Sequence, residues 1–91
     1  MLEGSIRVVN RLGLHARAAA QLVKLAGRFK SRIILKRLDK EVEANAKSML
    51  SVLALAASFN TILSLTVEGK DEAEAFAAVE RLFNSRFGEN E

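Results

Sequence analysis

Apolar and polar residues alternate in four short segments of the chain, a period that predicts β-strands with one covered face. These segments are residues 2–9, 32–38, 41–44 and 61–69. Their inward positions are Leu2, Ile6, Val8, Ile33, Leu35, Val42, Ala44, Leu63, Leu65 and Val67. A polar break at Asp39-Lys40 predicts that the second and third segments form a hairpin. Ile34 and Ile62 fall on the outward side of these segments and are mild exceptions to the pattern.

Three other segments follow the helical period. Residues 16–27 are one of them, and residues 47–57 form a shorter one with Ser48 as the predicted N-cap. Asp71 followed by Glu74 resembles a capping box at the start of the last helix. The predicted core positions of the first and last helices are Ala19, Leu22, Val23, Ala26, Ala75, Val79, Leu82 and Phe83.

The resulting order is strand, helix, strand, strand, helix, strand, helix. One face of the sheet is apolar and the other is mostly polar, so all three helices are expected on the apolar face. The pattern therefore predicts an α+β fold: a two-layer, open-faced sandwich with a four-stranded antiparallel sheet. Ninety-one residues suffice for one compact domain, which we expect to span residues 1–91.

The composition excludes several classes of site. The chain has no cysteine and one histidine, so a disulfide framework, a thiolate metal site and a histidine cluster are excluded, and we predict no metal and no cofactor. Residues 1–48 carry a net charge of +7 and residues 49–91 a net charge of −4. The basic half favours an acidic partner, although a solvated mixed-charge surface fits equally well. Nucleic acid is disfavoured because the chain has no Tyr or Trp for base stacking.

Neither a targeting segment nor a membrane span is indicated. Residues 1–10 lack a basic region followed by an apolar stretch. The longest nearly apolar run, residues 49–59, is far shorter than the roughly 20 residues that cross a bilayer. The sequence therefore predicts a soluble cytoplasmic protein without membrane contact.

The only histidine, His15, lies at the junction between the first strand and the first helix. Unpaired N–H groups at a helix start attract anions, and Arg17 adds a guanidinium to the same place. A neutral imidazole is nucleophilic, so His15 is a candidate phosphoryl acceptor. No second base lies near it in sequence, so a partner enzyme would have to drive the reaction. A lone histidine at a helix start is, however, more often a cap or a surface residue.

Two motifs resemble the HPr family, the histidine phosphocarriers of the bacterial phosphotransferase system. Residues 13–19, GLHARAA, resemble the family's active-site segment. Residues 44–55, ANAKSMLSVLAL, resemble its regulatory-serine segment, and the element order resembles the HPr fold. The C-terminal residues and the Ala-rich first helix are closer to the nitrogen-type branch, NPr, which feeds a regulatory acceptor.

The resemblance implies that enzyme I phosphorylates His15 on Nδ1 and that His15 passes the group to an EIIA-type protein, with Arg17 as the cation of the site. It implies that an HPr kinase/phosphorylase modifies Ser48. The apolar residues of the implied docking patch are Leu14, Met49, Leu50 and Leu53, with Leu53 more buried and Met49 more exposed. The implied basic rim is Arg17, Lys24, Arg28 and Lys47. A monomer fits a carrier that presents one face to successive partners.

Three departures from the family pattern test this assignment. Ala18 replaces a usual proline, and Ala56 and Asn60 stand where glycine is common. Asn60 tolerates a positive φ, whereas Ala56 does so less readily, so the helix around residues 47–57 is a candidate to run on. The alternative to a carrier is an HPr-like interaction module that has lost transfer and acts on a partner allosterically.

Overall fold

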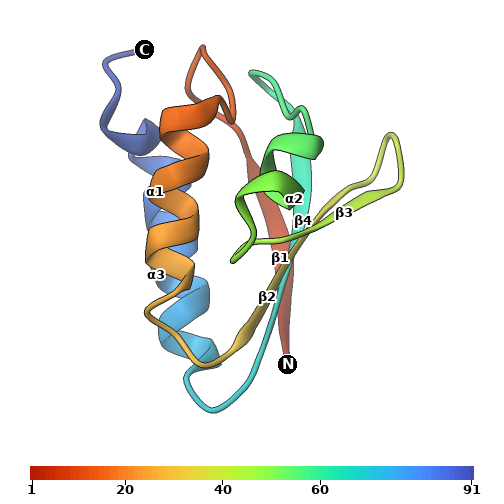
Figure 1. Cartoon of the computed structure of the whole chain (residues 1–91), viewed down its shortest axis with the longest axis vertical. Coiled ribbons are helices and arrows are strands. Elements are labelled where there is room, and N and C mark those ends of the chain that lie inside the picture. Colours follow the sequence, from red (N-terminus) through yellow and green to blue (C-terminus); the bar gives the residue numbers. More distant parts are fainter.

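The computed structural model describes residues 1–91, and its elements follow the predicted order (Figure 1). The strands are β1 (Leu2–Arg7), β2 (Arg32–Arg37), β3 (Val42–Asn45) and β4 (Ile62–Glu68). The helices are α1 (Ala16–Ala26), α2 (Met49–Ala54) and α3 (Glu72–Asn84). A short 3₁₀ turn, η1 (Arg86–Gly88), follows α3 and was not predicted.

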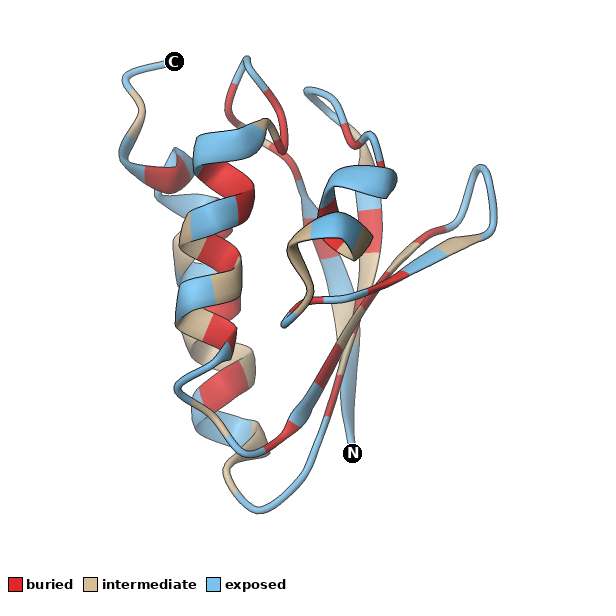
Figure 2. Cartoon of the chain, in the orientation of Figure 1, coloured by how far each residue is buried: buried red, intermediate tan, exposed pale blue.

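The four strands form one antiparallel sheet in the order β1-β4-β2-β3. In this register Ile6 lies opposite Leu63 and Leu65 lies opposite Leu35, so the inward positions form continuous apolar rows. The helices cover this face and enclose a core of 21 buried apolar residues (Figure 2). The predicted α+β sandwich is confirmed.

Some predicted core positions are less buried than expected. Leu2 is 36% exposed because it lies at the end of the edge strand β1, where one side has no neighbouring strand. Val23, Val42 and Leu82 are only partly buried and pack at the margin of the core. The outward residue Ile62 is 47% exposed, as its parity predicts.

Helix α2 does not run on to residue 57. It ends at Ala54, and Ala56 adopts a left-handed φ of 48°. The buried guanidinium of Arg37 donates to the carbonyl oxygens of Leu55 and Ala56, at 3.0 Å and 2.7 Å. Arg37 thus satisfies carbonyls that a helix end leaves unpaired, which stabilises the unfavourable backbone of Ala56. Asn60 has a φ of 72°, as predicted.

The predicted capping box at Asp71 and Glu74 is wrong. Asp71 precedes α3, but its side chain makes no capping hydrogen bond to the helix. Its carboxylate instead accepts hydrogen bonds from the backbone N–H groups of Lys30 and Ser31 and from the Ser31 hydroxyl. Glu72 accepts a hydrogen bond from the Gly69 N–H, at 3.1 Å. Asp71 therefore ties the start of α3 to the loop between α1 and β2.

Candidate functional site

The loop that precedes α1 is fixed by hydrogen bonds. The Asn10 side chain is fully buried and donates from Nδ2 to the Gly13 carbonyl, at 2.9 Å. Gly13 has a φ of 69°, a conformation that favours glycine. The N–H of Leu14 donates to the Ala57 carbonyl, at 2.9 Å. These contacts anchor the backbone immediately before His15.

His15 is the N-cap residue of α1, with an extended backbone and no side-chain capping bond. The imidazole is therefore not used as a cap, contrary to one reading of the sequence. The His15 carbonyl accepts the first helical hydrogen bond, from the Ala19 N–H, at 2.8 Å. N–H groups of a first helical turn have no intrahelical acceptor and carry a partial positive charge. His15 thus lies where an anion is stabilised.

The C-terminal segment brings a carboxylate to His15 that sequence reasoning missed. Glu89 Oε2 lies 2.5 Å from His15 Nε2, and Glu89 Oε1 accepts from Asn10 Nδ2 at 3.0 Å. The hydrogen bond from His15, with smaller contributions from Asn10 and Arg17, lowers the pKa of Glu89 below its usual value. Glu89 is therefore ionised at neutral pH. No motif signals this contact, because 74 residues separate the partners.

Several contacts hold the C-terminal segment in place. Phe87 is buried and packs edge-on against Phe83 of α3, with ring centroids 4.9 Å apart. Gln21 of α1 donates to the Phe87 carbonyl at 3.1 Å, and the Arg11 N–H donates to the Glu91 carbonyl at 3.0 Å. Glu89 therefore belongs to a packed segment that crosses the start of α1.

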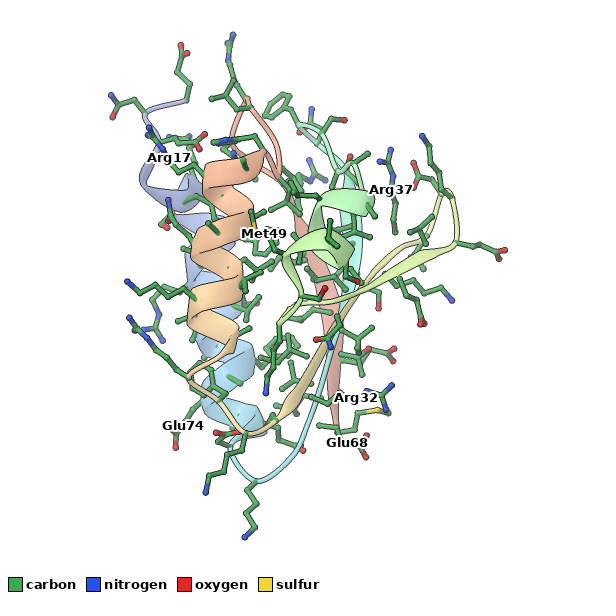
Figure 3. The ribbon with its side chains drawn as sticks, in the orientation of Figure 1. Arg17, Arg32, Arg37, Met49, Glu68 and Glu74 are labelled. Carbon is green, nitrogen blue, oxygen red and sulfur yellow. The ribbon has the colours of Figure 1, made fainter.

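Arg17 is exposed on the first turn of α1 and makes no hydrogen bond or ion pair within the chain. Its guanidinium is thus available to an anion at His15. Figure 3 shows Arg17 at the N-terminal end of α1 and Met49 between α1 and α2. Lys24 and Arg28 line a groove of about 230 Å³ between α1 and α3, together with Leu82. These two cations therefore face the α3 side of α1.

The apolar patch differs from its predicted form. Leu53 is 38% exposed and Leu50 is 83% exposed, whereas Met49 is partly buried against the core. The predicted order for Leu53 and Met49 is therefore reversed, because the side of α2 that carries Met49 turns toward the core. Leu14 is buried and belongs to the core rather than to an exposed surface. Lys47 donates from Nζ to the Phe29 carbonyl at 2.7 Å.

Ser48 caps α2 as predicted. Its hydroxyl oxygen accepts a hydrogen bond from the Ser51 N–H at 3.3 Å, and its own N–H donates to the Asn45 carbonyl at 2.9 Å. The residue is partly exposed.

Two further properties of the whole chain bear on function. No three acidic or histidine side chains come together in a group suited to a metal ion. None of the helices combines the length and the apolar character that crossing a membrane requires.

Comparison with known proteins agrees with the fold. The family model described as "PTS HPr component phosphorylation site" matches residues 2–85. The phosphocarrier protein HPr of Treponema pallidum is 47% identical over 89 residues, 98% of this chain and 99% of that protein. The HPr of Neisseria meningitidis serogroup A is 43% identical over the full length of both. The structure is also similar to a crystal structure of HPr from Thermoanaerobacter tengcongensis, with a TM-score of 0.94 and 38% sequence identity, and the alignment covers 100% of both chains.

The matched family model and these relatives show that a chain of this fold, with a histidine at the start of its first helix, is similar to small phosphocarrier proteins. The chain belongs to the HPr family of the phosphotransferase system. These relatives carry the name HPr, and the nitrogen-type branch stays a prediction.

Proposed function

We propose that His15 accepts a phosphoryl group on Nδ1 from phosphorylated enzyme I and passes it to an EIIA-type protein. The observation that carries this proposal is the position of His15 at the start of α1, with Nε2 engaged by Glu89 and no partner on Nδ1 within the chain. The side chain is 29% exposed, which gives a donor protein access to the ring.

Phosphoryl transfer needs little covalent assistance from a carrier and depends mainly on position and charge. The Nδ1 lone pair forms a bond to phosphorus while the donor's nitrogen–phosphorus bond breaks. The first-turn N–H groups of α1 and the guanidinium of Arg17 lie where they stabilise the charge on the phosphoryl oxygens. The transferred phosphoryl group carries no proton that the chain must remove, so the chain acts as a relay and its partners drive each step.

Phosphoenolpyruvate, Mg²⁺ and the cognate enzyme I provide the direct test. We expect intact-mass analysis at neutral pH to show a gain of one phosphate on the protein. Brief acid treatment should remove it, because phosphohistidine is acid-labile whereas phosphoserine is not. No gain with an enzyme I that phosphorylates another carrier would contradict the proposal and favour a transfer-inactive interaction module.

Replacing Arg17 by alanine is expected to slow phosphorylation of His15 on the order of a hundredfold, because one charge opposite the transferred group is lost. Lys70→Ala is the matched control: it removes an exposed cation between β4 and α3, outside the implied docking patch, so its rate should stay within about threefold of wild type if the effect is local. Stopped reactions analysed for phosphoprotein measure both rates. Equal losses in the two variants would assign the effect to overall charge instead.

The partners are proposed from charge and exposed apolar area. Leu50 and Leu53 form an exposed apolar pair on α2, and the N-terminal half of the chain is basic. An acidic protein surface with an apolar centre fits both features. These properties support enzyme I and an EIIA-type acceptor as partners. We further propose that the protein acts as a monomer in the cytoplasm, with neither nucleic acid nor membrane as a ligand.

Ser48 is proposed as a second, regulatory phosphorylation site for an HPr kinase/phosphorylase. Phosphate there adds about −1.5 to −2 charges beside Met49, and an acidic enzyme I is then repelled. We expect Ser48→Asp to slow phosphorylation of His15 on the order of tenfold, at an unchanged thermal midpoint, because the aspartate retains an N-cap oxygen. Ser48→Asn is the control, because asparagine retains an N-cap oxygen without adding charge, and its transfer rate should equal that of wild type. Equal transfer rates for Ser48→Asp and wild type would remove the regulatory role.

A further inference from the structure

We propose that Glu89 is the positioning residue of His15: its carboxylate holds the imidazole with Nε2–H directed into the protein and Nδ1 directed toward the phosphoryl donor. This inference rests on the proposed transfer at His15 and adds a residue to it. Glu89 lies beyond residues 2–85, the part of the chain that the family model matches.

The direction of the hydrogen bond follows from the protonation state of Glu89. An ionised carboxylate only accepts hydrogen bonds, so His15 Nε2 must be the donor across the 2.5 Å contact. In a neutral imidazole that bears its proton on Nε2, the lone pair resides on Nδ1. The Glu89 contact thus selects the tautomer in which Nδ1 is the nucleophile.

Asn10 fixes Glu89 in turn. The buried amide donates from Nδ2 to both Gly13 and Glu89, while its Oδ1 has no hydrogen-bond partner. Rotating the amide by half a turn would place Oδ1 against two acceptors and lose both bonds. An unpaired buried acceptor costs about 1–3 kcal/mol, so an amide held in this orientation indicates that the two bonds outweigh that cost.

An unusual backbone conformation of the C-terminal segment brings Glu89 to His15. Arg86, Phe87 and Gly88 have consecutive φ values of 58°, 54° and 77°. Two left-handed residues in succession that are not glycine are unfavourable and persist only where packing compensates. The burial of Phe87 against Phe83 supplies that packing. After this turn the chain passes the start of α1, where Glu89 contacts His15.

Glu89 also stabilises the positive charge that the His15 ring acquires during transfer. When Nδ1 bonds to phosphorus and the donor nitrogen leaves with its electron pair, the ring keeps its Nε2 proton and becomes positively charged. That charge develops beside the Glu89 carboxylate, which stabilises it. When the acceptor takes the phosphoryl group, the ring returns to the neutral form with the same proton on Nε2.

The variant Glu89→Ala tests the inference by two measurements. In the unphosphorylated wild type we expect an NMR signal from the His15 Nε2–H that is protected from exchange with water, and in Glu89→Ala we expect that signal to be lost. We expect kcat for phosphorylation by enzyme I to fall on the order of tenfold, with KM unchanged, because ring orientation and not docking is altered. Glu89→Gln retains an acceptor oxygen and should restore the protected signal and part of kcat.

Glu91→Ala is the matched control, because it removes a carboxylate from the same segment while the backbone carbonyl that binds Arg11 remains. It should behave as wild type in both measurements. A wild-type kcat in Glu89→Ala would overturn the inference, as would a protected Nε2–H in that variant. The NMR signal is read without phosphate, so its loss reports on the contact even if the wild type proves unable to accept a phosphoryl group.

Discussion

Replacing His15 by alanine is expected to abolish phosphorylation by enzyme I and to leave the fold intact. The chain has no second histidine, so no other imidazole is available as acceptor. The His15 side chain makes no capping bond and lies outside the apolar core, but it donates a hydrogen bond to the Glu89 carboxylate, so its removal should lower the free energy of unfolding by about 1–3 kcal/mol. Intact-mass analysis for phosphate and a thermal melt measure the two expectations.

The variant His15→Gln removes the nucleophilic nitrogen but keeps a hydrogen-bond donor for Glu89, so it tests the two roles of His15 separately. A glutamine amide retains a donor for Glu89, so the C-terminal segment keeps its place, but it offers no nucleophilic nitrogen. Both variants should therefore remain unphosphorylated, and His15→Gln should unfold closer to the wild-type temperature than His15→Ala. An acid-labile phosphate on either variant would show that His15 is not the acceptor.

The strands and helices were predictable because each obeys one local rule. Alternation of side chains located the sheet face, as in the row of Leu63, Leu65 and Val67. The cap at Ser48 was likewise predictable, since a serine before a short apolar helix has one favourable role. His15 and Arg17 were candidates for a similar reason: they lie two residues apart in sequence, and both belong to the start of one helix.

The missed features depend on contacts between distant segments. Glu89 reaches His15 because the segment after α3 passes the start of α1, and nothing in the local sequence of either residue signals the other. Asp71 satisfied a capping pattern, yet the loop N–H groups near Ser31 offered its carboxylate better donors. Competition of this kind is decided by tertiary packing, which local spacing does not encode.

Exposure on α2 was mispredicted for a geometric reason. A helix of six residues makes fewer than two turns, so the hydrophobic period is too short to fix which side is inward. Val52 takes the core position, which turns Leu53 partly outward and Met49 partly inward. The apolar surface offered to a partner therefore consists of Leu50 and Leu53 in particular.

Gly13→Ala is expected to cause the largest loss of stability among single substitutions near the site. A Cβ at Gly13 would lie 2.6 Å from the Ala57 carbonyl oxygen and 2.9 Å from Ser58 Cα, and the backbone there has a φ of 69°. Ala57 has little freedom to move away, because its carbonyl also accepts the Leu14 N–H. We expect the free energy of unfolding to fall by about 3 kcal/mol, combining left-handed strain with a backbone clash.

Gly88→Ala separates the two causes. Gly88 has a φ of 77°, but a Cβ there meets no atom within 4 Å, so that variant should lose only about 1 kcal/mol. Chemical denaturation of the two variants gives the difference. Because Gly13 lies two residues before His15, a backbone shift of about 1 Å in Gly13→Ala should also slow phosphoryl transfer on the order of a hundredfold below its unfolding temperature. Equal destabilisation of the two variants would show that the clash is relieved, and the placement of His15 would then not depend on the close approach of Gly13 to Ala57.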